Sequence, residues 1–268
     1  MTREIRNKIL EKYENKDDKI FVASILDLVH KFEMSGIVTH TSFLNLHEKS
    51  TAVSILNMLN INIEVFLPVS DIERTVIFLI PEHYNLEDID KLYDSYITCL
   101  KITPPPKVTL MHKDYMGAIY NAGIKENMIG DIFINNNSGY VFILKQLESY
   151  YLNNLLYVSK NEVKTHTLPL TNSEVKELKV TYKDMELIIP SMRVDVILSN
   201  VFNLSRNEAK NKIENGDLVI NAKEMYFASY EVKVNDIISF RKCGKIKIGE
   251  VIRKTKSANT VLSVQKYI

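Results

Sequence analysis

The stretch that most restricts the fold is residues 205–223, SRNEAKNKIENGDLVINAK, which passes from a helix to a strand without a linker. Ser205 and Glu208 have the spacing of a capping box, in which each side chain bonds the other residue's backbone amide at a helix start. Gly216 suits the left-handed conformation that ends many helices. The residues DLVIN then alternate as a short strand. The helix must therefore fold back directly onto the sheet that this strand joins.

The predicted helix has two distinct faces. Ala209 and Ile213 fall one turn apart and form its buried face, whereas Arg206 and Lys210 fall one turn apart on a different face. A second amphipathic helix precedes it, with its apolar residues at Val194, Ile197, Leu198 and Val201 and with Arg193 at its start.

Both helices are expected to pack on a small sheet made from DLVIN, DIISFR and KIKIGEVI. Arg193, Arg206, Lys210 and Lys223 would then point from one side. Helix N-terminal amides and clustered guanidinium groups bind phosphate oxygens well. This end of the chain is therefore a candidate polyanion-binding surface.

The charge distribution agrees with that expectation but does not decide it. The whole chain carries 34 Lys and Arg against 33 Asp and Glu. Residues 190–268 carry 14 against 8, a net of +6, which leaves 20 against 25, a net of −5, for the rest. A basic end on a mildly acidic chain favours a polyanionic partner, although a net of +6 is also compatible with an ordinary solvated surface.

Four motifs in order carry a first resemblance: RVD (193–195), SRNEA (205–209), IENGDLVINAK (213–223) and NDIISF (235–240). Their sequence and spacing resemble the αL RNA-binding domain of the ribosomal protein S-four superfamily, with Ala222 and Asn235 in place of the usual glycines. The resemblance implies RNA binding by this domain. The residues expected to contact RNA there are Arg193, Ser205, Arg206, Asn207, Lys210, Lys212, Asn221 and Lys223.

Two further segments, LMHKDYMGAIYNAGIKENMIGDIFI (110–134) and ERTVIFLIP (73–81), are similar to the YlmH family. That resemblance implies a factor of ribosome-associated quality control, genetically linked to cell division, that binds the large ribosomal subunit and tRNA on stalled, split ribosomes and supports tailing of the nascent chain. It also implies a second RNA footprint at His112 and Lys113. The chain departs from the family pattern at Lys113, at Glu126, where a basic residue is usual, and in the tail KTKSAN (254–259).

The predicted fold class is α+β, in three domains. Residues 1–82 form an N-terminal helical α/β unit, and residues 83–170 a ferredoxin-like α/β plait in the order β-α-β-β-α-β. Residues 171–189 are a connecting segment with strand character, and residues 190–268 form the αL domain. The clearest local signal is the hairpin GDIFINNNSGYVFILK, whose turn residues tolerate positive φ.

Several classes of function are disfavoured by the sequence. No apolar run approaches the roughly 18–20 residues of a membrane span, and the charged N-terminus is unlike a signal or transit peptide, so a cytoplasmic protein is expected. With 8 glycines and neither GxGxxG nor a P-loop, we expect no nucleotide cradle. Cys99 and Cys243 lie apart from any histidine cluster, and we expect no metal, no cofactor and no disulfide.

Two local patterns admit more than one interpretation. His112 and Asp114 have side chains that can serve as a catalytic acid and base. Residues i and i+2 do not share a helix face, however, which favours a structural or RNA-contacting role. Tyr115 and Tyr120, or Tyr140 and Phe142 on the hairpin, are candidates for stacking on bases or for the core. For the hairpin pair the core is favoured.

The expected function is therefore a non-catalytic, monomeric RNA-binding protein whose partners are rRNA and tRNA on the large ribosomal subunit. The alternative is an rRNA-modifying enzyme, pseudouridine-synthase-like, that docks RNA through the αL domain. Such enzymes usually carry that domain first, whereas here it comes last. A deep pocket with a perturbed carboxylate would favour the enzyme, and a shallow basic face would favour the binding protein.

Overall fold

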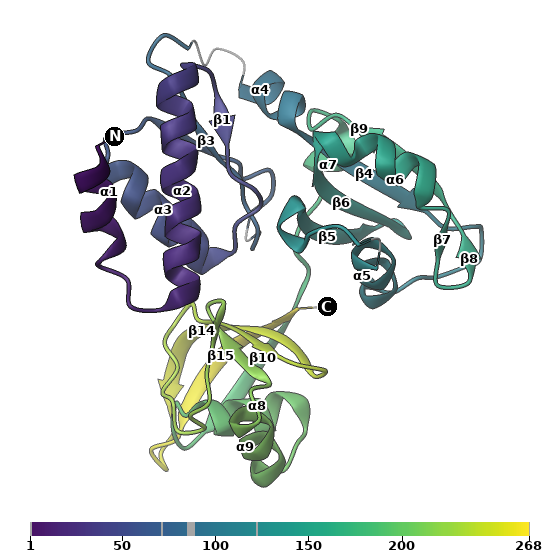
Figure 1. Ribbon diagram of the computed structural model, residues 1–268. Helices are drawn as coiled ribbons and strands as arrows, with labels where there is room; N and C mark the ends of the chain where they lie inside the picture. Colours follow the sequence, from purple (N-terminus) through teal and green to yellow (C-terminus); the bar gives the residue numbers. More distant parts are fainter. Residues whose placement is uncertain (1, 71, 85–88, 122, 268) are drawn as a thin grey trace. The chain divides into compact units, whose positions relative to one another are not determined.

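A computed structural model describes residues 2–70, 72–84, 89–121 and 123–267. The chain forms two compact units, residues 1–180 and 181–268, and each is described by itself (Figure 1). Both units are mixed α+β structures with antiparallel sheets, which confirms the predicted class. Within the described residues, no helix is long and apolar enough to cross a membrane.

The first part of unit 1 packs helices on a short sheet. Its elements are α1 (Arg3–Leu10), α2 (Lys16–Ser35), β1 (Thr39–His40), α3 (Leu46–Met58), β2 (Ile63–Val65) and β3 (Ile77–Leu79). The strands form an antiparallel sheet in the order β1-β3-β2, in which β2 and β3 pair with each other. α1 and α2 are separate helices, and the Asn15 side chain caps the start of α2 by accepting the Asp17 N–H at 2.7 Å.

The second part of unit 1 is a four-stranded sheet with helices packed on both faces. Its elements are α4 (Ile89–Tyr96), β4 (Ile97–Thr103), α5 (His112–Tyr120), η1 (Glu126–Met128), β5 (Ile129–Asn135), β6 (Ser138–Leu144), η2 (Lys145–Leu147), α6 (Glu148–Asn154), β7 (Tyr157–Val158), β8 (Asn161–Glu162), β9 (Lys164–Leu168) and α7 (Ser173–Lys176). The strand order is β5-β6-β4-β9, and neighbouring strands are all antiparallel. The hairpin of β7 and β8 was not expected. Residues 85–88, which fall in the expected plait domain 83–170, lie outside the described residues.

The hairpin of β5 and β6 turns as its sequence predicts. Asn136 and Asn137 have φ of 47° and 60°, so both turn residues take the left-handed conformation of a two-residue hairpin turn. Tyr140 and Phe142 are each 1% exposed, and Tyr115 is fully buried. The core assignment of the hairpin pair is confirmed, and Tyr115 is likewise unavailable for stacking.

Successive residues of β6 face two different cores because side chains alternate along a strand. Val141 and Ile143 belong to the core under α5 and α6. Tyr140 and Phe142 belong to the core shared with the first part of the unit, where the Phe142 ring meets the Phe66 ring edge-on at 5.6 Å. One sheet face is thus covered by α5 and α6, and the other by the N-terminal part together with α4 and α7.

The two segments that carry the family resemblance contact each other. The Asp131 carboxylate accepts the backbone N–H groups of Glu73 at 2.8 Å and Arg74 at 3.1 Å. Arg74 also donates to the Glu126 carbonyl oxygen at 2.9 Å and forms an ion pair with the Glu126 carboxylate. Glu126, one of the departures from the family pattern, therefore serves a contact inside the protein.

Unit 2 is a six-stranded antiparallel sheet with two helices. Its elements are β10 (Tyr182–Ile189), α8 (Val194–Phe202), α9 (Arg206–Glu214), β11 (Leu218–Ile220), β12 (Lys223–Glu224), β13 (Ile237–Phe240), β14 (Gly244–Lys254) and β15 (Thr260–Tyr267), in the sheet order β10-β15-β14-β13-β11-β12. The strands expected from DLVIN, DIISFR and KIKIGEVI are present. Ile197 and Ile213 of the helices pack with Ile238 and Ile246 of the sheet in one core.

The strand character expected in 171–189 is present in β10, but β10 belongs to the sheet of unit 2 rather than to a connection between domains. β10, which lies in the segment expected to connect domains, pairs along its whole length with β15, which was not expected as a strand. Leu187 and Ile189 of β10 and Leu262 and Val264 of β15 are buried in the unit's core. The sheet therefore includes 182–189, ahead of the expected start near 190.

Candidate nucleic-acid interface

A buried aspartate holds the two arginines at the starts of α8 and α9. The Arg193 guanidinium donates from Nε to Asp195 Oδ1 at 3.0 Å and from Nη2 to Oδ2 at 2.9 Å. Arg206 Nη2 lies 3.9 Å from the same Oδ2. The Asp195 side chain is 7% exposed, against 41% for Arg193 and 61% for Arg206. The carboxylate sits beneath the guanidinium groups and leaves both in contact with solvent.

The start of α8 is itself anchored by a neighbouring loop. The Val194 N–H donates to the Tyr230 carbonyl oxygen at 2.8 Å, and the Asp195 N–H donates to the Ala228 carbonyl oxygen at 3.3 Å. Arg193 also forms an isolated antiparallel bridge with Glu231. The hydrogen bonds to Asp195 raise the pKa of Arg193 further above its usual range, so this cation is permanent. The backbone of residues 193–195 is therefore held by the loop at residues 228–231.

The start of α9 has the capping box that its sequence predicts. The Glu208 N–H donates to the Ser205 hydroxyl at 3.2 Å, and the Ser205 N–H donates to Glu208 Oε2 at 2.8 Å. The bond from the Ser205 backbone lowers the pKa of Glu208. Ser205 thus fixes the helix start, and the next two side chains, Arg206 and Asn207, are exposed.

The two lysines of α9 have different surroundings. Lys210 Nζ lies 3.7 Å from Glu214 Oε1, and its side chain is 55% exposed. Lys212 Nζ lies 3.4 Å from Asp217 Oδ2 and 5.8 Å from the centre of the Phe240 ring, and its side chain is 31% exposed. Lys210 continues the surface that Arg206 begins, whereas Lys212 packs toward the core. We call Arg193, Arg206 and Lys210 the basic face.

Asn221, expected to flank the RNA contact, is used inside the fold. Its amide nitrogen donates to Asp236 Oδ1 at 2.8 Å, and its amide oxygen accepts the Ile237 N–H at 2.9 Å. Asn221 and Ala222 have φ of 49° and 64° and form the turn between β11 and β12. Lys223 follows that turn and is exposed.

The two residues that replace family glycines both keep a glycine-like backbone. Ala222 has φ of 64° and Asn235 has φ of 71°. Asparagine tolerates this left-handed region better than alanine does, so Ala222 is the more strained of the two. The turn geometry survives both substitutions.

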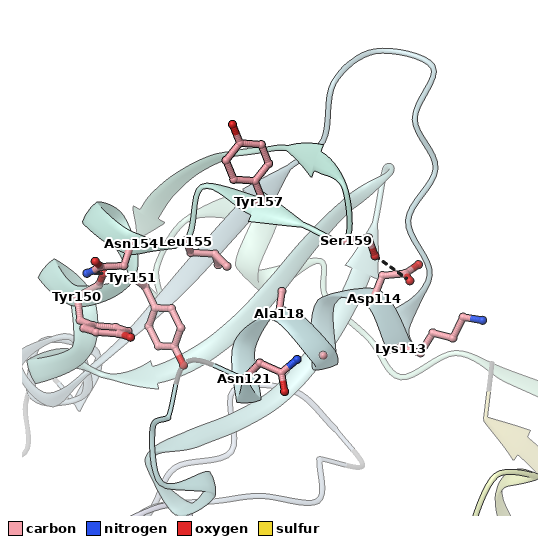
Figure 2. Close-up of a pocket in the computed structure, with 11 residues that line it drawn as sticks. Lys113, Asp114, Ala118, Asn121, Tyr150, Tyr151, Asn154, Leu155, Tyr157 and Ser159 are labelled. Atoms are coloured by element: carbon pink, nitrogen blue, oxygen red, sulfur yellow. Dashed lines mark hydrogen bonds between the residues drawn. The ribbon is translucent and has the colours of Figure 1, made fainter.

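The middle of unit 1 contains a hollow of about 490 Å³ beside α5 (Figure 2). We call it the α5 hollow, and its lining residues are Lys113, Asp114, Gly117, Ala118, Asn121, Tyr150, Tyr151, Asn154, Leu155, Tyr157 and Ser159. They come from α5 on one side and from α6 and the hairpin of β7 and β8 on the other. Lys113 of the expected second footprint lines this hollow. His112 is exposed at the start of the same helix.

Asp114 organises the rim of the hollow. Its carboxylate accepts the Met111 N–H at 2.8 Å, which caps the start of α5, and the Ser159 hydroxyl at 3.2 Å, which ties α5 to the turn between β7 and β8 (Figure 2). Of the roles considered for the pair His112 and Asp114, these contacts give Asp114 a structural one. Within the described residues, no group of three metal-ligating side chains is present.

The sequence analysis did not find the α5 hollow because its lining is not local in the sequence. Tyr150, Asn154 and Tyr157 lie far along the chain from Lys113 and Asn121. The two neighbouring tyrosines of LESYYLNN were only a weak sign of a site. Adjacent residues of a helix point in different directions, so one of two neighbouring tyrosines commonly faces solvent. Asp195 was quoted within a motif, but its contact with Arg206 depends on how α8 and α9 pack.

A family model, two relatives and one solved structure are similar to this chain. A family model described as "Putative RNA-binding domain in YlmH" matches residues 91–172. The chain is 21% identical over 242 residues to "Ribosome-associated protein quality control protein P2" of Bacillus subtilis (strain 168), covering 90% of this chain and 92% of that protein. It is 35% identical over 57 residues to "Mitochondrial transcription rescue factor 1" of Mus musculus, covering 21% and 24%. A solved structure, "Cell division protein ylmH from Streptococcus pneumoniae", aligns with a TM-score of 0.48 and 19% identity over 60% of this chain and 96% of that one.

Proposed function

We propose that this chain, a member of the YlmH family, is a non-catalytic RNA-binding protein that acts in ribosome-associated quality control. The proposal is supported by the match over 91–172 and by the relative of that name, which aligns with 90% of the chain. It is also supported by the chemistry of the basic face. We further propose that residues 83–170 are a ferredoxin-like plait, as the strand order β5-β6-β4-β9 favours, and that residues 190–268, extended by β10, are an αL domain.

The observation that carries the proposal is the pair of guanidinium groups held over Asp195. A guanidinium has five N–H donors, and Asp195 takes two of those of Arg193. The Arg193 side chain is 41% exposed and that of Arg206 is 61% exposed, so their other donors are available to bind phosphate oxygens with charge-assisted hydrogen bonds. Because Asp195 fixes the orientation of Arg193 and lies within ion-pair distance of Arg206, less side-chain freedom is lost when RNA binds.

The proposed partners are rRNA and tRNA on the large ribosomal subunit, which the protein would meet in the cytoplasm. The main contact is made by Arg193, Arg206 and Lys210. Ser205 positions the start of α9, and Asn207, next to Arg206 in the sequence, also contacts RNA. Lys212, Asn221 and Lys223 are secondary, since the first two already have partners inside the protein. His112 and Lys113 supply a second footprint. Two footprints on one chain strengthen binding because the second contact is intramolecular.

The runner-up, an rRNA-modifying enzyme, has less support from the site. A catalytic carboxylate has to reach its substrate. Asp114 contributes the one carboxylate among the described lining residues of the α5 hollow, and both its oxygens accept hydrogen bonds within the protein. A capping carboxylate of this kind serves the fold.

The experiment is gradient sedimentation of the tagged protein with ribosomal subunits. Wild type should travel with free large subunits at physiological salt and leave them at high salt, because Lys and Arg contacts to phosphate release counterions. An Arg206→Ala/Lys210→Ala variant, which keeps the Arg193–Asp195 pair, should remain at the top of the gradient. If the variant stays with large subunits at physiological salt, the basic face is not the anchor.

A further inference from the structure

The α5 hollow differs in character from the basic face, and its walls are partly aromatic. Tyr150 is 38% exposed, and its ring meets the Tyr151 ring edge-on at 5.5 Å. Tyr151 is in turn fixed, because its hydroxyl donates to the Ile119 carbonyl oxygen at 3.1 Å. Tyr157 belongs to β7, and its side chain also lines the hollow and is 59% exposed (Figure 2). Exposed aromatic rings beside a concavity provide stacking surfaces for bases.

Two asparagines add hydrogen-bonding groups to the lining. The Asn154 amide nitrogen donates to the Tyr150 carbonyl oxygen at 2.7 Å, which leaves its amide oxygen as an acceptor. The Asn121 side chain makes no hydrogen bond within the described part of the chain, so its amide offers both a donor and an acceptor. Amide groups of this kind read the edges of unpaired bases.

The charges of the lining are few and lie at the start of α5. Lys113 and Asp114 are the charged residues among the described lining, and the Asp114 carboxylate is engaged by Met111 and Ser159. Lys113 therefore stands as a cation beside the first turn of a helix, where it suits a phosphate. A nearly neutral interior with one cation at its edge matches a nucleotide whose base enters and whose phosphate stays outside.

The volume of the hollow restricts the ligand further. About 490 Å³ lies within the range of pockets that bury one small ligand. A base in a continuous duplex is stacked on both faces and paired along its edge, so it cannot enter such a hollow. A base in a loop, a bulge or a single-stranded end can.

We propose that the α5 hollow binds the base of an unpaired nucleotide in RNA, with Tyr150 stacking on the base, Asn121 and Asn154 contacting its edge, and Lys113 contacting its phosphate. The inference rests on the proposed RNA-binding function and adds the class of RNA that this footprint selects. RNA bound at the same time by the basic face and the hollow must offer exposed phosphates and an unpaired base.

Gly117 allows the hollow to be filled without loss of the fold. A Cβ built at Gly117 meets no atom within 4 Å, and its φ is not positive. Gly117→Leu therefore places a side chain in open space of the hollow, and leucine is a better helix former than glycine. The variant should be at least as stable as wild type in thermal melting.

The test measures binding of the full chain to two labelled RNAs by fluorescence anisotropy. One RNA is a short unstructured single strand, and the other is a blunt-ended, fully paired duplex of two strands without a loop. Gly117→Leu and Tyr150→Ala should each weaken binding to the single strand about tenfold, as the loss of one stacked base predicts, and leave binding to the duplex nearly unchanged. Tyr84→Ala is the matched control, because Tyr84 is also 38% exposed and lies outside the hollow.

Two results would overturn the inference: wild-type affinity of both hollow variants for the single strand, or an equal loss for both RNAs. Arg206→Ala/Lys210→Ala is measured in the same assay to keep this separate from the proposed function. If that variant is weakened and the hollow variants are not, only the inference fails. If none of the variants is weakened for either RNA, the proposed function fails as well.

Discussion

The basic face and the α5 hollow are two candidate RNA contacts with opposite physical character. The basic face presents cations around a buried carboxylate, so any attraction it has for RNA depends on charge. The hollow is concave, partly aromatic and nearly neutral, so its attraction depends mainly on stacking and on amide hydrogen bonds, with one phosphate contact from Lys113. Charge attraction is screened by salt, whereas stacking is not. The salt dependence of RNA binding can therefore distinguish the contribution of the basic face from that of the hollow.

The two regions nevertheless share one structural device, which is an aspartate that fixes a helix start. Asp195 holds the arginines at the starts of α8 and α9. Asp114 caps α5 and binds Ser159 in the turn between β7 and β8. In both places the carboxylate positions neighbouring groups, and other side chains are the ones proposed to contact RNA.

The largest expected effect comes from removing the whole basic face. The Arg193→Ala/Arg206→Ala/Lys210→Ala variant should lose on the order of a hundredfold in RNA affinity at physiological salt. The slope of log affinity against log salt should fall by about 2 to 3, since each cation is proposed to neutralise about one phosphate. A salt titration by fluorescence anisotropy measures both quantities.

The control for that variant removes the same number of charges elsewhere in unit 2. Arg253, Lys254 and Lys256 are exposed at the far end of β14 and in the turn that follows it. Their triple alanine variant has the same net charge as the basic-face variant. Equal losses for the two variants would mean that RNA responds to overall charge and that no defined basic face exists.

A smaller effect is expected when the two regions are separated. Residues 181–268 have their own core and should fold as a fragment that keeps most of the salt slope of the full chain. Because it lacks the α5 hollow, the fragment should bind single-stranded RNA about tenfold more weakly than the full chain. A fragment that starts at 190 loses β10, with buried Leu187 and Ile189, and should melt at a lower temperature.

Asp195→Asn distinguishes positioning from net charge. The substitution keeps the shape of the side chain and makes the chain more positive, so a purely electrostatic account expects tighter RNA binding. If Asp195 acts by orienting Arg193 and Arg206, affinity should instead fall roughly fivefold, because asparagine cannot hold two guanidinium groups as a carboxylate does. Isothermal titration with a hairpin RNA gives the sign, and tighter binding would refute the positioning role.

Local features of both regions were predictable from sequence. The capping box at Ser205 and Glu208 and the turn at Asn136 and Asn137 are set by neighbouring residues, and the structure contains both. The core was favoured over base stacking for Tyr140 and Phe142, and both are buried. Such features depend on a few adjacent side chains and not on how distant elements pack.

Features that depend on distant contacts were missed. The pairing of β10 with β15 joins segments separated by most of unit 2, and neither strand has a local turn signal that points to the other. The α5 hollow needs α5, α6 and a small hairpin to meet. Asn221 was expected to flank RNA, but both ends of its side-chain amide form hydrogen bonds with Asp236 and Ile237, at the start of β13.

The most direct test of the account is one salt series on one single-stranded RNA, comparing Arg206→Ala, Tyr150→Ala and wild type. The account predicts that the loss caused by Arg206→Ala shrinks as salt rises, with a slope lower by about 1. The loss caused by Tyr150→Ala should be severalfold at every salt concentration, with the wild-type slope. Parallel curves for Arg206→Ala and wild type, or a changed slope for Tyr150→Ala, would contradict the claim that the two regions bind RNA by different physics.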